Sequence, residues 1–127
     1  YSEPSIIYRL GSDTKILKPY KGKTIGAFGS ARSGPTLAFN YGLDKSFGMF
    51  FDDHPLKVGK YSYFNGLPVL PTKQISVINP AILIILAYLH SKKIVRKNIK
   101  YLENGGKFLS VYPKVFLITS KNYKKFI

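Results

Sequence analysis

The chain has 127 residues, of which 45% are hydrophobic, 15% aromatic and 20% charged, and it contains no cysteine. This length suits one domain with its own core, and the apolar fraction excludes a disordered tail. The missing cysteines exclude disulfides, thiolate zinc sites and a cysteine nucleophile. The longest apolar run, residues 81–89, is too short to span a bilayer, so we expect no membrane insertion. The chain opens on Tyr1 without a signal-peptide pattern, and we expect a cytoplasmic piece of a longer protein.

Positive charge dominates the composition. Twenty Lys and Arg residues against six Asp and Glu residues give a net charge of +14, which attracts polyanions such as nucleic acid, acidic membranes or nucleotide phosphates. All but three of the basic residues are scattered lysines, whereas arginine is favoured for bidentate contacts with phosphates and bases. Lys, Ile, Asn, Tyr and Phe are enriched together, as a biased genome composition would produce. A nucleic-acid partner is therefore disfavoured but stays open.

Turn-forming residues interrupt positions 1–22, which we interpret as a lead-in or linker from a preceding domain, with one extended candidate at residues 6–10. We expect the domain itself to occupy residues 23–127. Within it, the predicted strands are residues 24–28, 47–51, 81–87, 107–111 and 115–119. The predicted helices are residues 35–41, 72–78 and 91–103. The alternation predicts an α/β, Rossmann-like three-layer domain with a mostly parallel sheet of about five to six strands and helices on both faces.

Two of these elements have informative patterns. Residues 81–87 are an unbroken apolar run, which suits a central parallel strand with both faces covered. The helix at residues 91–103 is predicted to begin at Ser91 as its N-cap. Its inner stripe is predicted to be Ile94, Val95, Ile99 and Leu102. Its basic residues, Lys92, Lys93, Arg96, Lys97 and Lys100, are expected to form a solvated face rather than a nucleic-acid stripe.

The glycine-rich turn after the first predicted strand is the strongest local signal. Backbone N–H groups in such a turn, at the start of a helix, form a site for a phosphate or another anion. Gly29 and Gly34 let the chain approach a ligand closely, and Arg32 adds a positive charge. The glycine spacing departs from the dinucleotide fingerprint, and Pro35 stands where a P-loop has its lysine, so we reject an NTPase. The alternative is a plain strand-to-helix turn.

Two acidic residues, Asp52 and Asp53, end the second predicted strand. An acid at this place in mononucleotide-binding units hydrogen-bonds a ribose hydroxyl. The alternative is a turn, in which Asp side chains accept hydrogen bonds from nearby backbone N–H groups. Neighbouring strand residues point opposite ways, so one of the two carboxylates should face the crevice. We expect no metal site at residues 52–54, because three consecutive side chains rarely converge on one ion.

Polar and aromatic residues also follow the predicted central strand. Tyr88 and His90 stand at its carboxyl end, where open α/β sheets bind their ligands. Tyr88 could stack on a base or a sugar, and His90 could act as an acid or a base. The alternative is a loop tyrosine and a solvent-exposed histidine.

Several motifs occur in the order found in one enzyme family. Residues 26–37, GAFGSARSGPTL, resemble the opening of the C-terminal domain of SAM-dependent sugar C-methyltransferases. Further matches are residues 53–61 with the family's D-N-P-x-K-x-G stretch, residues 67–69 with I-P-I, residues 82–87 with its apolar strand, and residues 105–108 with G-G-K-F. The resemblance covers residues 22–113.

The resemblance implies a Rossmann-like C-terminal domain that helps to bind a nucleotide-linked keto-sugar. A zinc-binding module and a SAM-binding methyltransferase domain precede such a domain, so SAM and structural zinc are expected there. This chain shows no SAM site and is expected to be catalytically incomplete alone, with no cofactor of its own. The residues carried over to the phosphates or the sugar are Gly29, Ser30, Ala31, Arg32 and Gly34. Asp53 would border the nucleotide.

Three alternatives stay open. The same glycine turn and the D-D-x-P-x-K-x-G pattern also resemble N-terminal domains of sugar O- and N-acyltransferases that hold nucleotide-sugars. A module without enzymatic activity would use the charge on nucleic acid or on an acidic surface. A domain that has lost its ligand would account for Ser33, Asn65 and Leu89, which depart from the methyltransferase pattern.

Overall fold

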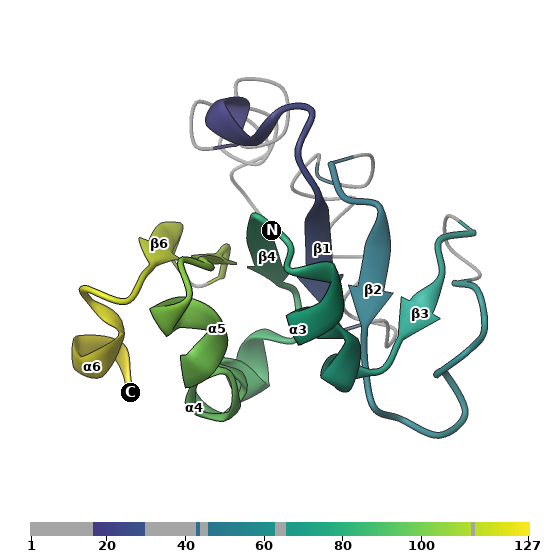
Figure 1. Ribbon diagram of the computed structural model, residues 1–127. Coiled ribbons are helices and arrows are strands. Elements are labelled where there is room, and N and C mark those ends of the chain that lie inside the picture. Colours follow the sequence, from purple (N-terminus) through teal and green to yellow (C-terminus); the bar gives the residue numbers. More distant parts are fainter. Residues whose placement is uncertain (1–16, 30–42, 44–45, 63–65, 113) are drawn as a thin grey trace, which may run out of the picture.

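The structure, a computed structural model, describes residues 17–29, 43, 46–62, 66–112 and 114–127 (Figure 1). Within these residues, six strands form one sheet in the order β3-β2-β1-β4-β5-β6. The strands are β1 (Ile25–Phe28), β2 (Met49–Phe51), β3 (Val69–Leu70), β4 (Ile82–Ile85), β5 (Phe108–Ser110) and β6 (Phe116–Ile118). Strands β1 to β5 pair in parallel, and β6 is antiparallel to β5. The predicted Rossmann-like α/β fold is confirmed.

Strand β4 lies at the centre of the sheet, between β1 and β5, as its apolar run predicts. All four of its side chains are buried. Ile82 and Ile84 pack into the core on one face of the sheet, and Leu83 and Ile85 pack into the core on the other. Because successive strand residues point to opposite faces, a strand covered on both sides needs apolar residues at every position.

The helical elements within the described residues are short, and most of them pack on one face of the sheet. They are η1 (Lys18–Tyr20), η2 (Thr72–Gln74), α3 (Ile75–Ile78), η3 (Tyr88–His90), α4 (Ser91–Lys97), α5 (Ile99–Glu103) and α6 (Tyr123–Phe126). Four of them contribute to a single core, with Ile75 from α3, Val95 from α4, Leu102 from α5 and Tyr123 from α6. These helices therefore form one layer over the sheet (Figure 1).

The opposite face of the sheet has a second core. Among the described residues, Leu17 beside η1 packs there together with Leu43 and Phe47. Leu17 belongs to the segment that the sequence suggests as a lead-in, yet only 6% of its surface is exposed. The helix predicted for this face, at residues 35–41, lies outside the described residues.

The predicted helix at residues 91–103 differs from the observed one in two ways. It is interrupted at Asn98, whose side-chain Nδ2 donates to the carbonyl of Ile94 at 2.7 Å, so that α4 and α5 are separate helices. The prediction of Ser91 as the N-cap is wrong. The three preceding residues already form η3, and the Ser91 hydroxyl donates back to the carbonyl of Tyr88 at 2.8 Å. The predicted inner stripe is confirmed, with Val95 and Leu102 fully buried.

Candidate functional site

The order in which the chain adds strands to the sheet reverses beside β1. From β1 the chain moves outward to β2 and β3, and it then returns to β4 on the other side and continues to β5 and β6. In open α/β sheets, ligands bind at this switch point, outside the carboxyl ends of the strands. The two central strand ends are tied together here, because the N–H groups of Leu86 and Ala87 both donate to the carbonyl of Phe28, at 2.9 and 3.1 Å.

Gly29, the first residue after β1, permits this close approach. Its φ of +103° lies in the region that favours glycine, and a Cβ placed on it would stand 2.8 Å from the backbone nitrogen of Ala87. Its own N–H donates to the carbonyl of Phe51, at the end of β2. Gly29 therefore joins the ends of β1, β2 and β4. The other residues of the predicted anion-binding turn, Ser30, Ala31, Arg32 and Gly34, lie outside the described residues.

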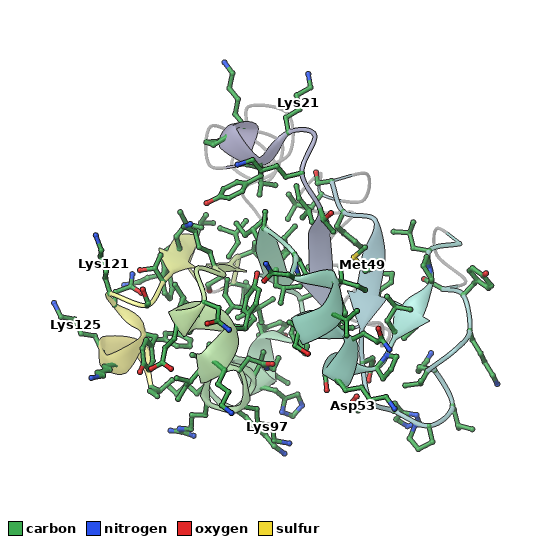
Figure 2. All side chains as sticks on the ribbon, in the orientation of Figure 1. Lys21, Met49, Asp53, Lys97, Lys121 and Lys125 are labelled. Carbon is green, nitrogen blue, oxygen red and sulfur yellow. The ribbon has the colours of Figure 1, made fainter. Side chains whose placement is uncertain are left out.

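A cleft of about 620 Å³, here named the switch-point cleft, opens at these strand ends, and its volume is within the range of small-molecule sites. Of the predicted residues, Gly29, Asp52, Asp53 and His90 line it. Lys57, Thr72, Lys93 and Lys97 line it as well. In Figure 2, Asp53 and Lys97 lie on the side of the molecule to which the strands β1 and β2 point, and Lys21 lies on the opposite side.

Asp53 is occupied by a contact within the fold. One carboxylate oxygen accepts from the backbone N–H of Thr72 at 2.9 Å, and the other accepts from the Thr72 hydroxyl at 2.6 Å. The carboxylate therefore links the end of β2 to the first residue of η2, 19 positions later. This link positions the cleft wall, and it competes with the ribose contact that the strand-end position predicts.

The neighbouring residues form a tight turn. The backbone N–H of His54 donates to Oδ1 of Asp52 at 2.9 Å, as expected for the turn alternative at this place. The imidazole Nδ1 of His54 accepts from the backbone N–H of Leu56 at 3.2 Å. No three His, Asp or Glu side chains gather as a metal site anywhere in the described part of the chain.

Lysines give the cleft its positive charge. Lys93 and Lys97 stand one turn apart on α4, where they are exposed and border the cleft, and Lys57 approaches from the turn after β2. The sequence predicts that the basic residues of this helix are exposed to solvent, and Lys93 and Lys97 are exposed. It does not predict that they border the candidate site. A signal was present, because a helix that follows a central strand begins at the carboxyl edge of the sheet. Nothing in the sequence indicates Thr72.

Tyr88 does not line this cleft. It lines a second cavity of about 530 Å³, which lies between α4, β6 and α6. Its ring packs edge-to-face against Tyr112, with the ring centroids 4.6 Å apart. Tyr88 and His90 therefore both line the second cavity, and His90 alone of the two also lines the first cleft.

Comparison with protein families gives a clear result. The C-methyltransferase C-terminal domain family matches residues 15–113. The chain belongs to this family. The match contains β1 to β5 and every residue that lines the cleft, and it confirms the resemblance carried by the sequence motifs. It also begins before η1, and so includes the buried Leu17.

No curated protein sequence matches the chain. Across the residues that the structure describes, every helix is too short or too polar to cross a membrane.

Proposed function

We propose that this C-methyltransferase C-terminal domain binds a nucleotide-linked keto-sugar in the switch-point cleft and holds it for a SAM-dependent methyltransferase domain that precedes it. The cleft at the ends of β1, β2 and β4 carries this proposal, because it has the size of a small-molecule site and three lysines at its border. Ammonium groups around a concave surface attract a diphosphate. Family membership supports the methyl-transfer context.

The division of labour follows from the chemistry. Methylation at a carbon beside a ketone needs a base that removes a proton, an environment that stabilises the enolate and a positioned methyl donor. We assign SAM and the structural zinc to the preceding domains and substrate positioning to this one. The chain alone should then transfer no methyl group when SAM and keto-sugars are added. Methyl transfer by the isolated chain would contradict this assignment.

Calorimetric titration tests the ligand class. The panel contains thymidine-, uridine- and guanosine-diphosphate sugars, each measured at low and at high salt. A diphosphate offers few charges, so we expect saturable, base-selective binding that changes modestly with salt. A nucleic acid contacted through 6–10 phosphates would instead lose roughly 10³–10⁵ in affinity between 50 and 200 mM salt. Binding to nucleic acid alone, with that salt dependence, would refute the proposal.

Lysine variants locate the binding. Lys93→Ala and Lys97→Ala should each weaken binding roughly tenfold, near the lower end for a charged hydrogen bond because both side chains are exposed. Lys121→Ala is the matched control, since Lys121 is also exposed but lies far from Lys97 and outside both cavities (Figure 2). Equal losses for all three variants would indicate diffuse charge attraction instead of a site.

A further inference from the structure

The second cavity adjoins the switch-point cleft. His90 and Lys93 line both, so the two spaces meet at the start of α4. The second cavity extends from there past Arg96 to β6 and α6. A ligand longer than one cavity can therefore pass Lys93 and enter the other.

The two cavities differ in their side-chain chemistry. The switch-point cleft contains two carboxylates, a hydroxyl from Thr72 and an amide from Asn98, which suit the hydroxyl groups of a sugar. Its two aromatic residues, Phe28 and Phe51, are buried. The second cavity is lined by aromatic rings, namely Tyr88, Tyr112, Phe116 and Phe126, and by basic side chains. None of its described lining residues is acidic.

We propose that a nucleotide-sugar lies across both cavities, with its base against the Tyr88–Tyr112 pair, its diphosphate beside Lys93 and His90, and its sugar in the switch-point cleft. This assignment rests on the proposed function and adds an orientation to it. Aromatic side chains bind bases of any sequence through their ring faces. Tyr112 is 44% exposed, so part of its ring surface is open to a ligand.

The exposure of the aromatic rings supports this orientation over the reverse one. Phe28 and Phe51 line the switch-point cleft but are buried, with 5% and 0% of their surfaces exposed. Tyr112 lies on the β5 side in contact with Tyr88 and is 44% exposed. Among the described lining residues, the ring surface open to a base therefore belongs to the second cavity.

Fragments of the ligand test the orientation. Uridine 5′-monophosphate represents the nucleoside half, or the thymidine or guanosine monophosphate if the calorimetric panel selects that base, and glucose 1-phosphate represents the sugar half. Each is titrated into the isotope-labelled chain and followed by NMR, which measures weak binding. The nucleoside monophosphate should shift the amide signals of Leu89 and Tyr112, and glucose 1-phosphate should shift those of Asp53 and Thr72.

Variants of the aromatic pair give the decisive result. Tyr112→Ala should weaken the nucleoside monophosphate roughly 5- to 150-fold, the range for a lost base stack, and should leave glucose 1-phosphate unchanged. Tyr112→Phe keeps the ring and should bind as the wild type does. Tyr61→Ala is the matched control, because Tyr61 is exposed and lies outside both cavities. Lys93→Ala should weaken both fragments.

The possible failures are distinguishable. If the wild-type chain binds no nucleotide-sugar, the proposed function is wrong and the orientation fails with it. If the wild-type chain binds but Tyr112→Ala leaves the nucleoside monophosphate unchanged, only the orientation is wrong. A loss confined to glucose 1-phosphate would reverse the assignment of the two cavities.

Discussion

The packing of Gly29 against β4 leads to a quantitative prediction for Gly29→Ala. Gly29 and Gly105 both have a positive φ, of +103° and +96°. A Cβ on Gly29 would stand 2.8 Å from the backbone nitrogen and 2.9 Å from the Cβ of Ala87, whereas a Cβ on Gly105 would have no atom within 4 Å. Gly105→Ala is therefore a matched control, in which only the backbone conformation is penalised.

The free-energy cost separates into two contributions. The left-handed conformation costs a non-glycine residue about 1–2 kcal/mol, and alanine recovers about 0.4–1 kcal/mol by restricting the unfolded chain. Both contributions also apply to Gly105→Ala, which should lose roughly 1 kcal/mol of stability. Gly29→Ala additionally presses on the backbone of Ala87, and overpacking of this kind costs about 1–3 kcal/mol. The difference between the two variants should therefore be about 1–3 kcal/mol.

Urea unfolding followed by far-UV circular dichroism measures this difference from the two midpoints, provided that the slopes agree. Equal destabilisation of Gly29→Ala and Gly105→Ala would show that β4 does not approach Gly29 as closely as the structure places it. The explanation of the glycine as a joint between the strand ends would then be wrong.

Two further predictions concern side-chain hydrogen bonds. The Tyr101 hydroxyl donates to the carbonyl of Pro80 at 2.9 Å and burial raises its pKa, so Tyr101→Phe should cost about 1–3 kcal/mol at pH 7. The pKa of Tyr101 in the folded state exceeds its unfolded value near 10. The contribution of Tyr101 to wild-type stability is therefore complete below pH 10 and decreases as the pH rises above it. The difference in unfolding free energy between the wild type and Tyr101→Phe should therefore narrow by up to about 1.4 kcal/mol per pH unit above pH 10 in urea unfolding. Thr72→Val removes the hydroxyl that binds Asp53 and should cost about 0.5–1.5 kcal/mol by thermal unfolding, whereas Thr72→Ser keeps the bond.

Each of these has a clear contrary outcome. A gap between Tyr101→Phe and the wild type that stays constant up to pH 11 would mean that Tyr101 does not titrate differently on unfolding. Equal stabilities for Thr72→Val and Thr72→Ser would mean that the Asp53 contact contributes nothing measurable.

The class of fold and the order of its elements follow from local residue patterns. The run at residues 81–87 is apolar at every position, and only a strand covered on both faces needs that pattern, so the central place of β4 was predictable. Gly29 was predictable as a turn residue because it directly follows the first predicted strand and opens a glycine-rich segment. The family motifs added the C-methyltransferase context, because they record an ordered set of residues that composition and periodicity do not contain.

The interior of the site depends on contacts between segments that are distant in the sequence. Asp53 and Thr72 are 19 residues apart, and their bond depends on how the chain returns along β3 to the end of β2. Tyr88 meets Tyr112 because β4 and β5 are neighbours, which strand periodicity alone does not state. The N-cap at Ser91 was predicted wrongly for a similar reason, since the helical turn before it depends on where the chain leaves β4. Local pattern specifies which face of an element is buried, but contacts between distant segments follow from strand order and packing.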